Sequence, residues 1–147
     1  MSTHEGPTAS SRLLLLSLGS GVVWALIALA LGYSQLHQRI WGGVLVAPLI
    51  GLALGLAARG FGRRPGWARA LHALAALYAA AALFGLAVGV ADLVLLDAPG
   101  RRPGAVVLQS VYGVLWGITF TGYVALLWPL SYANHALLGR YARRSEG

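Results

Sequence analysis

Few side chains in this sequence carry the groups with which proteins do chemistry. The 147 residues include four acidic residues, four histidines and no cysteine. Without cysteine there are no disulfides, no thiolate metal ligands and no thiol redox reactions. One carboxylate, Asp92, follows directly on a long apolar stretch. Because ionisable groups next to hydrocarbon are rare and costly, Asp92 is the first candidate for a functional residue.

Polar and aromatic residues recur every three or four positions on a later segment, so they share one face of a helix. This face consists of Gln109, Tyr112, Trp116, Thr119 and Tyr123. Together with Asp92 it forms a candidate polar intramembrane site, with an Asp92 to Gln109 contact near the outer ends of consecutive helices. The alternative is that Asp92 reaches water at the interface, or pairs with Arg101 or Arg102 in the loop.

Two histidines, His72 and His135, offer the only route to a metal or haem site. Both belong to the same side of the predicted bundle, so they could in principle share an axial-ligand geometry. The sequence has no HExxH, no paired carboxylates, no phosphate-binding glycine loop and no serine nucleophile elbow. We therefore expect no metal site, no catalytic residues and no cofactor.

The elements that must position these residues are four apolar stretches. They cover residues 13–33, 41–58, 71–91 and 105–127. About 20 residues span the ~30 Å of hydrocarbon in a bilayer, and a chain with 58% hydrophobic and 10% charged residues has too little polar surface for a water-soluble globule. Barrel strands would alternate polar and apolar residues, and these stretches do not. The predicted fold is an all-α integral membrane protein, a four-transmembrane-helix bundle over 13–129 that follows a disordered polar N-terminus over 1–12.

The fourth stretch stays compatible with a helix for longer than one crossing, up to residue 138. Pro129 divides it and removes the hydrogen bond to the Ala125 carbonyl, which predicts a kink. We expect a kinked fourth helix that extends into an interfacial, amphipathic and basic C-terminal helix and tail over 130–147. The alternative is a helix that projects straight into the cytoplasm.

Small residues at four-residue spacing predict where the helices pack closely. The candidate packing positions are Gly43, Ala47, Gly51, Gly55, Gly85, Gly89, Gly113 and Gly117. Such spacing is common by chance in a chain with twenty glycines, but it occurs on every predicted helix. The sequence leaves open whether these faces meet within one chain or between chains.

All eleven basic residues are arginines, and they fall at the ends of the apolar stretches. With four spans, eight arginines lie on the side that holds both termini and three on the other, so both termini should be cytoplasmic. The arginine bias suggests a bacterial genome and a bacterial cytoplasmic (inner) membrane. The net charge of +7 then serves contact with anionic lipid headgroups rather than nucleic acid. The residues expected at the headgroups are Arg63, Arg64, Arg140, Arg143 and Arg144.

These observations favour a small, non-catalytic membrane subunit. It would pack with itself or with a larger membrane complex through glycine-lined helix faces. The alternative is a small homo-oligomeric transporter or channel with a polar site around Asp92 and Gln109. A redox or lipid-modifying enzyme is a weaker third class, because acid, base and metal groups are scarce.

Overall fold

A computed structural model describes residues 9–36, 40–95 and 102–145. Five α-helices and one short 3-10 helix account for nearly all of them. The helices are α1 (Ala9–Leu36), α2 (Ile40–Ala57), α3 (Gly66–Leu95), α4 (Pro103–Phe120) and α5 (Tyr123–Ser145), with η2 (Phe61–Arg63) between α2 and α3. The described part of the chain is thus all-α. We expected a disordered segment over 1–12, but α1 begins at Ala9, so residues 9–12 are helical. Residues 1–8 lie outside the described residues.

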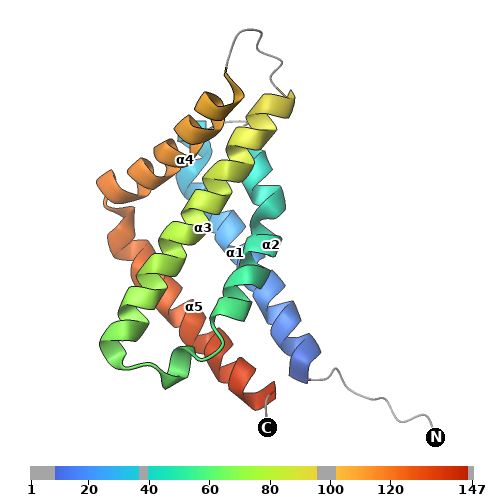
Figure 1. The fold of residues 1–147 in the computed structure, drawn as a ribbon, viewed down its shortest axis with the longest axis vertical. Helices are drawn as coiled ribbons and strands as arrows, with labels where there is room; N and C mark the ends of the chain where they lie inside the picture. The colour runs from blue at the N-terminus through green and yellow to red at the C-terminus, as the bar shows by residue number, and fades with distance from the viewer. Residues whose placement is uncertain (1–8, 37–39, 96–101, 146–147) are drawn as a thin grey trace, which may run out of the picture.

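Four of the helices, α1 to α4, are long and apolar enough to cross a membrane. At 1.5 Å per residue, the 28 residues of α1 and the 30 residues of α3 reach about 42 and 45 Å. Figure 1 shows α3 running the full length of the molecule, with α4 beside its upper part and α5 crossing its lower part. The start of α1 and the end of α5 lie at the same end (Figure 1).

The contacts among α1, α2 and α3 are close because glycine lets the backbones approach. A Cβ at Gly51 would lie 2.5 Å from the Cα of Gly21, and a Cβ at Gly55 would overlap the side chain of Ser17. Ser17 is buried and its hydroxyl donates to the Leu13 carbonyl at 2.8 Å, so it adds no unpaired group to this interface. On the other face of α2, the ring of Phe84 lies directly over Gly43.

The contact between α3 and α4 uses the same device. A Cβ at Gly85 or Gly89 would lie 2.7 Å from the Cα of Val111 or Val107 respectively. These two glycines and three of the predicted packing residues on α2 thus sit at helix contacts within one chain. Ala47, the fourth predicted on α2, is also buried, and its carbonyl lies against Gly21.

Gly113 and Gly117 on α4 differ from this pattern. A Cβ at either position would meet nothing within 4 Å. In the described part of the chain no helix contacts the side of α4 that they occupy, so they make no packing contact within one chain, and packing between chains stays a prediction.

The fourth apolar stretch is not one helix with a kink at Pro129. Its first helix, α4, ends at Phe120, and Gly122 adopts the left-handed conformation with φ 76°. Glycine has no Cβ to oppose that conformation, so it serves as the usual residue after a helix C-cap. Pro129 instead lies inside α5, which begins at Tyr123. The break between the two helices thus lies at Gly122, seven residues before the kink predicted at Pro129.

Helix α5 packs against the bundle along one face. Leu127, Ser131, His135 and Leu138 are buried there, against α1, α3 and η2. A small core of Leu13, Ala58, Leu138 and Ala142 closes this end of the molecule. Away from this face, α5 exposes Leu130 and Leu137.

Candidate functional site: an apolar cavity above a histidine cluster

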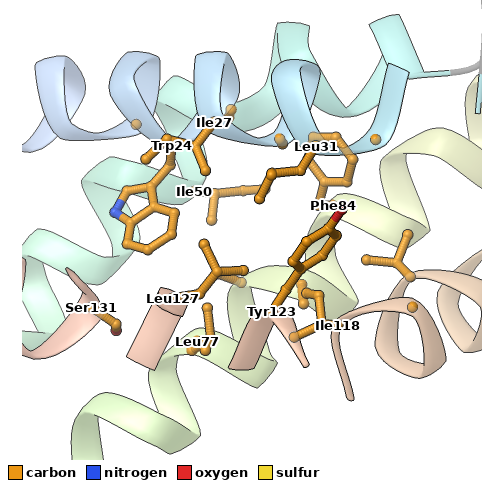
Figure 2. Close-up of a pocket in the computed structure, with 18 of the residues that line it drawn as sticks. Trp24, Ile27, Leu31, Ile50, Leu77, Phe84, Ile118, Tyr123, Leu127 and Ser131 are labelled. Atoms are coloured by element: carbon orange, nitrogen blue, oxygen red, sulfur yellow. The ribbon is translucent and has the colours of Figure 1, made fainter. Parts of the chain in front are cut away.

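A cavity of about 320 Å³ lies between the five helices. Trp24, Ile27 and Leu31 of α1 face Leu127 and Tyr123 of α5 across it (Figure 2). Other walls come from α2, α3 and the glycine-bearing side of α4. The lining is almost wholly apolar, and no charged side chain occurs among the described residues that form it.

The cavity exists because α1 and α4 share little contact. Helix α1 packs on α2 and α5, whereas α4 packs on α3 and α5. Gly113 and Gly117 both line the cavity, and the space beside them is open. The glycines that the sequence marks as packing positions on α4 therefore widen the gap instead of closing it.

Two polar side chains that line the cavity have no hydrogen-bond partner among the described residues. They are the hydroxyl of Tyr123 and the indole N–H of Trp24. Figure 2 shows Tyr123 reaching across from α5 toward Leu31 and Phe84, with Trp24 entering from α1. By contrast, Ser131 at the floor is satisfied, because its hydroxyl donates to the Ala73 carbonyl at 2.9 Å.

His135 also forms part of the floor and is only 1% exposed. Its Nδ1 lies 2.8 Å from the Ser131 carbonyl. A carbonyl only accepts, so Nδ1 carries the proton and Nε2 of the neutral ring is an acceptor. Burial lowers the pKa of the His135 imidazole and outweighs the opposing effect of the hydrogen bond to Ser131. The ring is therefore held neutral, with a buried Nε2 that has no partner.

His72 lies against His135, with the two ring centroids 5.5 Å apart in an edge-to-face arrangement. Phe61 of η2 contacts both rings at 5.6 and 5.7 Å and is itself 2% exposed. The Nδ1 of His72 lies 2.9 Å from the guanidinium of Arg64. Since arginine only donates, this Nδ1 accepts, and the proton of the neutral ring lies on Nε2. That Nε2 makes no hydrogen bond, although the Ala57 carbonyl lies near the ring.

In this arrangement the two rings do not offer two bare nitrogens to one metal ion. A metal ligand must present a bare nitrogen, and the hydrogen bond from Arg64 leaves His72 with its proton on the free Nε2. No group of three potential ligand side chains gathers in the described part of the chain. The sequence placed the two histidines at one end, and the structure brings them into ring contact.

The predicted polar stripe lies mostly on the outside of α4. Tyr112 stacks on Trp116 at 5.6 Å, and Trp116 stacks on Phe120 at 3.8 Å, with each ring at least half exposed. Gln109 is exposed on the same helix. Thr119 contacts α3, where its hydroxyl lies 3.0 Å from that of Tyr78. Of this stripe, only Tyr123 lines the cavity.

Asp92 is buried on α3, with 6% of its surface exposed. Gln109 is exposed on α4, and a contact between the two residues stays a prediction. Arg101, the alternative partner in the loop, lies outside the described residues. Arg102 is exposed at the start of α4.

The basic residues collect at the end that holds the histidines. Arg63, Arg64, Arg140 and Arg143 are all exposed there. The guanidinium of Arg143 lies over Gly62 of η2. This contact joins α5 to the turn after α2. The side chain of Arg144, the fifth residue expected at headgroups, lies outside the described residues.

Sequence reasoning missed Phe61, Ser131 and the role of Trp24. Phe61 is the one aromatic residue in a turn rich in glycine and arginine. An apolar side chain in such a polar turn indicates that it is buried against the bundle. Ser131 precedes His135 by one helical turn, the spacing at which a backbone carbonyl meets a side chain. The sequence did not indicate that Trp24 lines a cavity, because an aromatic residue inside an apolar stretch usually packs against neighbouring helices.

Comparison with models of protein families, with curated proteins and with solved structures gives no match.

Proposed function

We propose that this chain is a small, non-catalytic subunit of a bacterial inner-membrane assembly, formed with further copies or with a larger complex. Four helices long and apolar enough to cross a membrane support the multi-pass placement. The proposal also keeps both termini in the cytoplasm, because the arginine-rich end holds the start of α1 and the end of α5. Its exposed arginines would meet anionic headgroups at that surface.

The observation that carries the subunit proposal is the outer face of α4. Among the described helices α4 is the candidate span with no buried residue. Its outer face combines an amide at Gln109 with the stacked rings of Tyr112 and Trp116. An amide inside hydrocarbon is stabilised when a neighbouring helix supplies a hydrogen-bond partner. We infer that this face contacts another transmembrane helix.

In this proposal, the glycine faces of α2 and α3 hold the chain's own helices together. Gly51, Gly55, Gly85 and Gly89 are already occupied by contacts within the chain. They are not free to receive a partner helix. Association with a partner therefore falls to α4, through aromatic and amide side chains.

The transporter alternative requires Asp92 and Gln109 on a common polar pathway. Asp92 is buried and Gln109 is exposed, and the cavity between the helices is apolar. These features favour the subunit over the transporter.

The chain lacks cysteine, so a single introduced cysteine reports contacts without background. We expect Tyr112→Cys to form a disulfide-linked dimer under mild oxidation in native membranes if the partner is a second copy. The matched control is Leu49→Cys, which is equally exposed but lies on α2. If the partner is another protein, Tyr112→Cys labelled with a thiol-reactive photo-cross-linker should instead give a heterologous cross-linked band on illumination. The absence of any cross-linked band specific to Tyr112→Cys would contradict the proposal.

A further inference from the structure

We propose that the cavity between the helices binds one uncharged, single-chain molecule from the lipid phase. Its chemistry is an alkyl or isoprenoid chain that bears a hydrogen-bonding oxygen. This binding site is separate from the outer face of α4 and does not depend on the subunit proposal.

The size and lining of the cavity define the chain. Ligand sites begin at about 300 Å³, and this cavity has about 320 Å³. If a methylene group takes about the ~30 Å³ of a water molecule in the liquid, the space holds roughly ten carbons. Ile27, Ile50, Leu77 and Leu127 give it apolar walls. Charged headgroups are disfavoured, because no charged side chain lies among the described lining residues.

The Tyr123 hydroxyl defines the polar group of the ligand. It lies at the cavity with no hydrogen-bond partner in the described part of the chain. Figure 2 shows the indole nitrogen of Trp24 on the other side of the cavity, pointing away from this hydroxyl. The tyrosine hydroxyl donates or accepts, so a ligand that satisfies it carries a hydrogen-bonding oxygen, as in an alcohol, ketone or ester. The neutral His135 in the floor adds no charge that would favour an anion.

The route of entry defines the phase from which the ligand comes. Helices α1 and α4 share little contact, and between them the space beside Gly113 and Gly117 is open. Both helices are apolar enough to lie in a bilayer. A molecule dissolved in the membrane therefore enters sideways. At the arginine-rich end, Phe61, His72 and Leu138 close the bundle to a water-soluble molecule.

The test is photolabelling of the full chain in phosphatidylcholine vesicles. The probe is a ten-carbon alcohol that carries a diazirine, with unlabelled decan-1-ol as competitor. We expect saturable labelling, and we expect the labelled peptides to come from α1, α4 and α5. Labelling that does not saturate, or that maps to the outer face of α2 and α3, would overturn the proposal.

A filling variant keeps the result independent of folding. Gly117→Leu places a side chain in the cavity, and its Cβ meets nothing within 4 Å, so the helices need not move. We expect at least a tenfold loss of saturable labelling with unchanged circular dichroism. The matched control is Gly19→Leu, which has equal space at an exposed position outside the cavity. Equal labelling of the two variants would contradict a cavity site.

Tyr123→Phe separates recognition of the oxygen from simple filling of a hole. We expect roughly fivefold weaker binding of the alcohol probe, the effect of one neutral hydrogen bond, and unchanged binding of a diazirine-bearing decane. Equal losses for both probes would refute the role of the hydroxyl. Lipid extracted from wild type and Gly117→Leu identifies the natural source: a neutral single-chain lipid depleted in the variant supports the proposal, and depletion of a phospholipid alone overturns the single-chain assignment.

Discussion

The two sides of this bundle use the same residue in opposite ways. Between α1 and α2, Gly51 lets two backbones approach so closely that no Cβ fits. On α4, Gly117 repeats the same spacing from Gly113 and faces open space. A small-residue pattern therefore specifies only a place where another backbone can come close. Whether a helix comes there depends on the rest of the fold.

The largest expected effect follows from filling the closed side. Gly51→Leu forces a side chain onto the backbone of Gly21, which cannot yield without separating α1 from α2. Overpacking of this kind costs about 3 kcal/mol. Gly117→Leu should cost nothing and gain up to about 1 kcal/mol from helix propensity.

Thermal unfolding in mild detergent, followed by circular dichroism, measures both variants. The expected result is a clearly lower midpoint for Gly51→Leu and an unchanged or slightly higher one for Gly117→Leu. Similar midpoints for the two variants would remove the distinction between the closed and the open side.

The break between α4 and α5 sets the shape of the open side, and it should be the next most sensitive point. Gly122 holds φ 76°, where a Cβ costs roughly 1 to 2 kcal/mol. Gly122→Ala should therefore destabilise the fold by about 1 kcal/mol, and Gly122→Asn by less. Gly66→Ala is the control, since Gly66 has open space and no positive φ. The measurement is the denaturant midpoint of unfolding for each variant. Equal midpoints for Gly122→Ala and Gly66→Ala would mean that the break between α4 and α5 does not depend on glycine.

The sequence predicted four helices long and apolar enough to cross a membrane and five glycine positions that lie at helix contacts, because length, hydropathy and spacing are local properties. It misplaced the end of α4, because proline was weighed above glycine. Thr121 and Gly122 form a C-cap and the left-handed residue after it, a signal that the sequence contains. Pro129 is accommodated inside α5. The cavity was beyond prediction, since it arises from the missing contact between α1 and α4, which no local pattern encodes.

The smallest expected effect is a dependence of stability on pH, and it comes from His135, which lines the cavity. Burial lowers the pKa of His135 below its usual 6.5, so the unfolded chain takes up this proton at a higher pH than the folded chain. Stability is then constant above about pH 6.5 and falls as the pH drops below it. Among the described residues, the charged and titratable groups near His135 are His72 and, through it, Arg64, and a proton on His135 gains no acidic partner from either.

The measurement is the thermal midpoint of wild type and His135→Gln between pH 8 and pH 5. Glutamine takes up no proton in this range, so the variant starts lower at pH 8 and loses less as the pH falls. The slope for one proton is at most about 1.4 kcal/mol per pH unit, so the two curves should converge by a few degrees at most. His72→Gln shows how much of the remaining slope belongs to the neighbouring ring. Parallel curves for wild type and His135→Gln would mean that the buried floor of the cavity does not govern the acid sensitivity of the fold.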